Sequence, residues 1–156
     1  MDIEFPGCML RLDIPNGWNG EQEEEYAVLL SRRAAHGGEL RLLTNMYTVK
    51  GMGEANVSEM VAGLAKKQTR SADGQVYRLA SGALASCALQ TLTDVRPPLK
   101  SITWYVGVLR EPDTLLIVTF DYTVPIPDTT YPEVAAEIQL LSELVNSTEY
   151  YFAAEE

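Results

Sequence analysis

Residues 99–124, LKSITWYVGVLREPDTLLIVTFDYTV, contain the clearest structural pattern in the chain. Apolar side chains alternate with other residues on both sides of a short break, which is the period of two paired β-strands. We predict strands at 99–110 and 114–124, joined by a turn at 111–113. One face of this hairpin should be apolar and should consist of Ile102, Trp104, Val106, Val108, Leu116, Val118, Phe120 and Tyr122.

The sequence before this hairpin repeats the strand pattern. Five further strands are expected, at 8–14, 26–33, 40–48, 76–80 and 84–93. The first three should form an antiparallel meander, because strands that follow each other closely tend to pair. The acidic run at 21–25 is expected to be a solvated loop between the first two strands.

Two segments have the period of amphipathic helices. The first follows residues 50–53 and ends near Arg70, with Asn56 as the expected N-cap. Its apolar stripe should contain Met60, Val61, Leu64 and Ala65. The second begins near Thr130, which forms a capping box with Glu133. Its apolar residues Val134, Ile138, Leu141 and Val145 should lie on the sheet, while Glu133, Glu137 and Glu143 face water.

The order of these elements is βββ-α-ββββ-α. It predicts an α+β fold with a mainly antiparallel sheet of about six or seven strands and two helices. A chain of 156 residues is long enough for one self-sufficient core. We therefore expect a single globular domain over residues 1–156, with frayed residues at the C-terminus.

Three local features accompany this order. The opening strand runs into the turn Ile14-Pro15-Asn16-Gly17-Trp18, a long hairpin precedes the last helix, and that helix ends in a serine and an aromatic tail at 147–152. Together they resemble the Mog1/PsbP-like domains, which include the DcrB-like bacterial proteins. The resemblance implies a sandwich fold but carries over no residue roles, because the shared motif shapes a turn. That family covers partner binding, assembly factors, lipoproteins and chaperones for secreted effectors, so it implies little about function.

Charge is distributed unevenly along the chain. Residues 1–110 contain 12 acidic and 12 basic side chains, whereas residues 111–156 contain 10 acidic residues and no Lys or Arg. A field of one sign steers basic partners and repels phosphate groups. The alternative is that it only keeps a small protein soluble. Nucleic-acid binding is not expected, because the short basic cluster Lys66, Lys67 and Arg70 better fits a helix C-terminus.

The sequence contains no recognisable catalytic or metal-binding pattern. The sole histidine, His36, precedes two glycines and is expected to be a turn residue. Cys8 and Cys87 are far apart and should be buried as small hydrophobic residues. We therefore expect no enzyme activity, no metal and no cofactor.

Asp121 is the most interesting acid, because it lies in mid-strand on the face that carries Leu115 and Ile117. A buried acid there would have a raised pKa, which is common at functional sites. The interpretation that we favour is that Asp121 meets solvent, or Thr103 across the hairpin.

Location can be judged only from the absence of signals. No apolar stretch approaches the roughly 18 residues that a membrane span needs. Residues 1–6 lack the basic and apolar regions of a secretory signal. We therefore expect a cytoplasmic protein with no membrane insertion.

The leading hypothesis is a non-catalytic protein-binding module, such as a bacterial effector-associated chaperone or adaptor, or an immunity protein. Two helices can cover one face of the sheet, so the second apolar face would need another protein to cover it. The expected partner-binding residues are Tyr105, Leu109, Leu115, Ile117, Glu133 and Glu137. The partner would present a basic or an apolar segment.

Two alternatives stay open. One is a small-ligand carrier or hydrolase-like enzyme with a pocket between the sheet and the last helix. Its walls would be Trp18, Tyr47 and Trp104, although packing in the core explains these residues more simply. The other alternative is a structural homodimer joined through the second face of the sheet.

Overall fold

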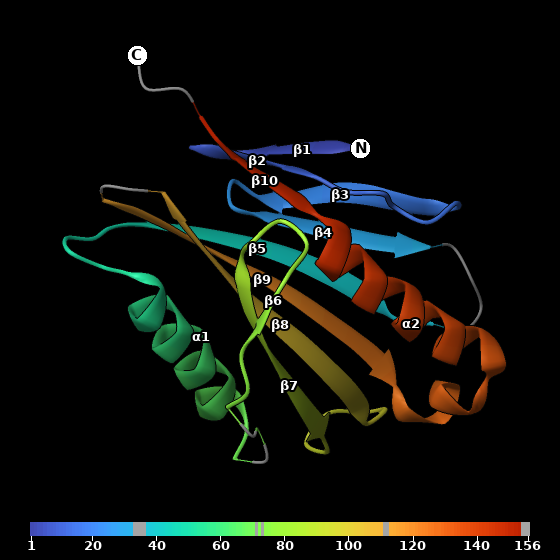
Figure 1. The fold of residues 1–156 in the computed structure, drawn as a ribbon. Helices are drawn as coiled ribbons and strands as arrows, with labels where there is room; N and C mark the ends of the chain where they lie inside the picture. The colour runs from blue at the N-terminus through green and yellow to red at the C-terminus, as the bar shows by residue number, and fades with distance from the viewer. Residues whose placement is uncertain (33–36, 71, 73, 111–112, 154–156) are drawn as a thin grey trace.

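The computed structural model describes residues 1–32, 37–70, 72, 74–110 and 113–153, without the side chain of Arg32. Its longest strands are β8 (Leu99–Arg110) and β9 (Thr114–Pro125), which pair antiparallel over their full length (Figure 1). Trp104 lies opposite Phe120, and both are buried. The predicted hairpin and its apolar face are confirmed, while residues 111 and 112 of the predicted turn lie outside the described residues.

This hairpin is part of a seven-stranded sheet with the order β3-β4-β5-β9-β8-β7-β6. The other members are β3 (Trp18–Glu24), β4 (Ala27–Arg32), β5 (Glu39–Thr48), β6 (Tyr77–Arg78) and β7 (Leu84–Leu92). Every neighbouring pair is antiparallel. The α+β class with a mainly antiparallel sheet is therefore confirmed.

A second, three-stranded sheet joins the two ends of the described chain. It consists of β1 (Asp2–Phe5), β2 (Cys8–Arg11) and β10 (Glu149–Phe152), in the order β1-β2-β10. Its apolar side chains, among them Leu10, share one core with Leu42 and Val118 of the large sheet. The two sheets therefore form a sandwich.

The predicted meander is wrong in its first strand. The segment expected at 8–14 lies in the small sheet, and its place beside β4 is taken by β3. Most of the acidic run at 21–25 is therefore a strand and not a loop. β3 forms one edge of its sheet and buries only Trp18. A strand with one buried side chain has no apolar alternation that the sequence could reveal.

The two helices cover opposite faces of the large sheet. Helix α2 (Pro132–Ser147) packs Val134, Leu141, Leu144 and Val145 into the sandwich core. Helix α1 (Glu54–Gln68) packs Val57 and Val61 against Leu115 and Ile117 on the other face. The expectation that both helices cover one face is therefore wrong. The region of β9 from 115 to 118 is apolar on both faces because it has a layer on each side.

Both predicted helix caps are misplaced by a few residues. The N-cap of α1 is Gly53, and Asn56 contributes by accepting a hydrogen bond from the Gly53 N–H at 2.9 Å. The N-cap of α2 is Tyr131, while Thr130 donates its hydroxyl to the carbonyl of Pro127 at 3.1 Å. Because Pro132 is the first residue of α2, its missing N–H costs no helical hydrogen bond.

Helix α1 lies close to the sheet because Gly107 has no side chain. A Cβ at Gly107 would lie 2.5 Å from Cγ1 of Val57 and 3.2 Å from Cγ1 of Val61. The buried hydroxyl of Ser86 also donates to the carbonyl of Val61 at 2.6 Å. These contacts fix where α1 lies across β7 and β8.

Substitution of Gly107 by alanine should therefore destabilise the protein. The new methyl group must displace Val57, and overpacking of this kind costs about 1–3 kcal/mol. A Cβ at Gly63, in α1 itself, would meet no neighbouring side chain within 4 Å, so Gly63→Ala should stabilise by about 0.5–1 kcal/mol. Urea unfolding of the two variants measures both changes. Equal effects would show that α1 does not depend on this close approach.

Candidate functional site

A groove of about 650 Å³ lies between α1 and the uncovered part of the sheet. One wall comes from α1 and the loop before it, through Met52, Asn56, Glu59, Met60, Gly63, Leu64 and Lys67. The floor and the opposite rim come from β5, β8 and β9, through Asn45, Tyr47, Tyr105, Ile117 and Thr119. We call this set of residues the α1 groove.

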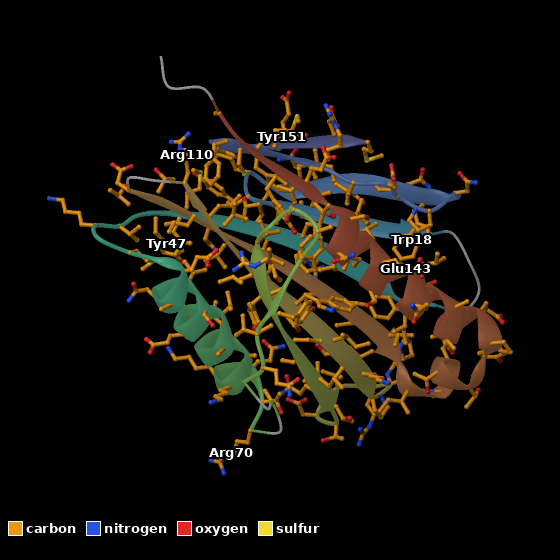
Figure 2. The ribbon with its side chains drawn as sticks, in the orientation of Figure 1. Trp18, Tyr47, Arg70, Arg110, Glu143 and Tyr151 are labelled. Carbon is orange, nitrogen blue, oxygen red and sulfur yellow. The ribbon has the colours of Figure 1, made fainter. Side chains whose placement is uncertain are left out.

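The groove exists because α1 covers only part of its sheet face. The helix lies mainly over β7 and β8, which leaves the same face of β5 and part of β9 open. Ile117 on the floor is buried, whereas Tyr47 at the end of β5 is 48% exposed. Figure 2 shows Tyr47 next to the start of α1. The result is an apolar trough that solvent can enter along the length of the helix.

The sequence contains a signal for this groove in the breadth of the apolar stripe on α1. A broad stripe can face two surfaces. Val61 and Ala65 are buried against the sheet, while Met60 and Leu64 are half-buried and line the groove. One edge of the stripe therefore holds the helix in place, and the other edge forms a surface.

A chain of hydrogen bonds extends from the groove across the sheet. The Tyr105 hydroxyl donates to Oε1 of Gln68 at the end of α1. Nε2 of Gln68 donates to Oγ1 of Thr103 at 2.8 Å, and that hydroxyl donates to Oδ1 of Asp121 at 3.1 Å. Ser101 donates to the same Oδ1 at 3.3 Å. We call Tyr105, Gln68, Thr103 and Asp121 the polar chain.

The hydrogen bonds of the polar chain show which groups surround the Asp121 carboxylate. The predicted contact of Asp121 with Thr103 across the hairpin is confirmed. Its carboxylate also lies next to Arg41, its cross-strand neighbour on β5, which pairs with Glu23 at 2.6 Å. Asp121 is therefore held in place by the hydroxyl groups of Ser101 and Thr103.

The environment of Tyr105 keeps its hydroxyl protonated. Burial raises the pKa of Tyr105, and the negative charge of Asp121 raises it further. Since an unperturbed tyrosine titrates near pH 10, the phenol is a neutral donor and acceptor at physiological pH. Its proton is donated to Gln68, so its oxygen can accept a hydrogen bond from a bound group, and the neutral phenol is not a base.

Of the four sheet residues predicted to bind a partner, two lie in the α1 groove. Tyr105 and Ile117 line it. Leu115 is fully buried under α1, so it is not available as a surface residue. Leu109 lines a separate recess of about 350 Å³ near the start of α1. The structure therefore divides the predicted apolar face into a covered part and an open groove.

The prediction that Glu137 faces water is wrong. Its side chain is 4% exposed, and its Oε1 accepts from the Tyr122 hydroxyl at 2.6 Å and from the Gly38 N–H at 3.0 Å. The helical period places residues 134, 137 and 141 on one face, and that face lies on the sheet. Glu133, in contrast, is exposed on α2. Glu137 is a structural acceptor and not part of a charged surface.

The three predicted pocket walls do not meet. Trp18 lines a small recess of about 240 Å³ beside Leu140 of α2, while Tyr47 lines the α1 groove. Figure 2 shows these two residues at different ends of the sheet. Trp104 is buried in the sandwich core. His36 lies outside the described residues.

The remaining chemical groups give little support for catalysis. Within the described part of the chain, no group of three His, Cys, Asp or Glu side chains could hold a metal ion. Cys8 and Cys87 are both present as thiols, and burial raises the pKa of the Cys8 thiol to about 11. A thiol with that pKa is a poor nucleophile at neutral pH.

No helix among the described residues combines the length and apolarity that a membrane crossing requires. The cytoplasmic location stays a prediction.

Comparison with known proteins identifies a shared fold. No family model matches the sequence, and no curated protein does. The structure resembles LpqN of Mycobacterium tuberculosis, described as involved in cell envelope biogenesis, with a TM-score of 0.63 and 10% identity over 97% of this chain and 90% of LpqN. It also resembles a Bacteroides thetaiotaomicron protein, with a TM-score of 0.60 and 15% identity over 94% of this chain. The chain spans 46% of that protein's length. At these identities the likeness concerns the fold alone.

The buried position of Glu137 predicts a large difference between two neighbouring acids. Glu137→Ala removes the acceptor of two buried donors, which should lower the free energy of unfolding by about 3 kcal/mol. Glu133→Ala, one helical turn earlier and exposed, should change it by less than about 0.5 kcal/mol. Urea denaturation followed by circular dichroism measures both. Similar small effects would mean that the Glu137 contacts contribute little to stability.

Proposed function

We propose that this chain is a non-catalytic protein-binding domain whose α1 groove receives an apolar segment of a partner protein. The observation that carries the proposal is the partial exposure of Met60 and Leu64 over the floor residue Ile117. Apolar side chains arranged along an open trough lose unfavourable contact with water when another apolar group covers them.

The form of the groove favours a flexible partner segment. Met52 and Met60 contribute unbranched side chains that can adapt to different apolar shapes. Tyr47 stands at the rim, and aromatic residues of this kind are common anchors in protein interfaces. The groove also offers amide groups from Asn45 and Asn56, which can exchange hydrogen bonds with a peptide backbone.

The polar groups support binding more than catalysis. The carboxylate of Asp121 already accepts from Ser101 and Thr103. A general base must lie within hydrogen-bond reach of the proton that it takes, and Asp121 is not among the residues that line the groove. Tyr105 is not a base, and its proton is already donated to Gln68.

The distribution of charge favours a chaperone or adaptor over an immunity protein. An immunity protein that masks a basic toxin site needs its acids around the contact surface. The ionic residues that line the α1 groove are one acid, Glu59, and one base, Lys67. The exposed acids Glu133 and Glu143 lie on α2, which covers the opposite face of the sheet. The acids of α2 can then speed the approach of a basic partner or maintain solubility without contributing to the groove.

A small-ligand carrier is the second candidate, and one observation favours it. The groove volume of about 650 Å³ falls within the range of roughly 300–1,000 Å³ that is usual for small-ligand sites. A carrier of this kind would use the first helix, not the last helix as the sequence suggested. A metabolite that stays bound to the purified protein, detected by native mass spectrometry, would favour this second function.

The proposal is tested by selecting a library of random displayed peptides on the wild-type protein. We expect enriched peptides with one or two large apolar residues that bind the Met60→Glu variant at least about tenfold more weakly, since a charge would be buried in the groove. Leu140→Glu is the matched control, because Leu140 is 47% exposed on α2 and distant from the groove. This variant should bind as the wild type does.

Thermal unfolding must first show that both variants fold. Enriched peptides that bind Met60→Glu as tightly as the wild type would place the binding surface elsewhere. A selection that enriches nothing over an unrelated acidic domain would count against protein binding altogether.

A further inference from the structure

The hydrogen bonds of the polar chain all donate in one direction, from Tyr105 toward the carboxylate of Asp121. A carboxylate accepts hydrogen bonds and has none to donate. Thr103 gives its single proton to Asp121 at 3.1 Å, which is nearer than the Ser101 hydroxyl at 3.5 Å. The oxygen of Thr103 then accepts from the amide nitrogen of Gln68. This orientation turns the carbonyl oxygen of Gln68 toward Tyr105, whose hydroxyl must donate to it. Each bond polarises the next, so the direction is reinforced along the chain.

This direction limits the hydrogen bonds that Tyr105 can make with a group bound in the groove. Tyr105 uses its only proton within the polar chain, so its oxygen can offer nothing but lone pairs to a bound group. Two other polar groups of the groove are less restricted, because the Thr119 hydroxyl can rotate and the Asn45 amide can turn to present either oxygen or nitrogen. The oxygen of Asn56 accepts from the Gly53 N–H, so this side chain has its N–H groups left to donate. Tyr105 is therefore a groove residue that the polar chain restricts to accepting hydrogen bonds.

We propose that Tyr105 selects partner segments that bring an N–H donor to the polar end of the α1 groove. This inference rests on the proposed function, and it names the chemistry of the segment: an apolar side chain followed by a main-chain or side-chain N–H. A segment that presents a carbonyl at this point places two acceptors against each other in a partly buried site. The segment would lose its water without gaining a hydrogen bond.

The charges around Tyr105 are compatible with a neutral donor. Lys67 and Glu59 line the same groove with opposite charges. Asp121 lies at the far end of the polar chain and next to Arg41. Because each of these charged side chains has one of opposite sign nearby, the selection of a segment depends on donor and acceptor geometry more than on net charge.

Two small probes isolate this property. Acetyl-leucine N-methylamide has a leucine side chain and a C-terminal N–H, and acetyl-leucine N,N-dimethylamide has the same side chain without that N–H. Both are neutral, so the charges of the groove affect them alike. Titration of the isotope-labelled protein, followed by the amide signals of Leu64, Tyr105 and Ile117, measures how tightly each probe binds.

We expect the wild type to bind the N-methylamide about tenfold more tightly than the dimethylamide, as one unmade hydrogen bond implies. Tyr105→Phe keeps the ring and removes the oxygen, so this preference should fall to near one. Asp121→Asn leaves Tyr105 in place but lets the polar chain reverse, because an amide can donate to Thr103. The preference should fall there too, although Asp121 is not expected to touch the probe.

The outcomes separate this inference from the proposed function. Equal binding of the two probes in the wild type would overturn the donor selection and leave the groove as a binding site. A preference that persists in Tyr105→Phe would overturn the role of Tyr105. A preference that persists in Asp121→Asn would overturn the one-way chain. If neither probe perturbs the three groove signals, the proposed function fails, and this inference fails with it.

Discussion

The pairing of β8 with β9 dictates where the other elements of this protein must lie. These strands lie inside the large sheet, and β9 is buried on both faces from 115 to 118. A strand in that position needs an apolar layer above and below it. The small sheet and α2 supply one layer, and α1 supplies the other. Both helices and the terminal strands are therefore placed by the same central hairpin.

The two layers are unequal, and the candidate site follows from that difference. The sandwich core extends over most of one face, whereas α1 lies mainly over β7 and β8 on the other. Its position is set by Gly107, which allows a close approach, and by the bond from Ser86. Where the helix cover ends, the apolar floor meets solvent along one side and the polar chain at the end of the helix. An apolar trough with a polar end is a surface suited to recognition.

Sequence patterns predicted those parts of the fold in which local periodicity and burial coincide. The hairpin at 99–124 alternates clearly because both strands are long and have a buried face. The same reasoning failed for β3, which is an edge strand with a single buried residue. It also failed for the first strand, since alternation at 8–14 shows a half-buried strand but not which sheet contains it. For the site, the sequence analysis singled out Tyr105, Ile117 and Asp121. It assigned Met60 and Leu64 to the apolar stripe of a helix and did not identify them as surface residues.

Local sequence alone was sufficient to specify the α+β class, the central hairpin, the existence of two helices and the absence of Lys and Arg after residue 110. Three features arose only when the elements packed together: the helices lie on opposite faces, Glu137 is buried against Tyr122, and a groove remains beside α1. The physical reason is the separation along the chain of the residues that determine each feature. Periodicity is a property of neighbouring residues, so it specifies the element and its apolar side. The surface that covers that side is chosen by contacts between residues distant in the chain, which local patterns do not contain.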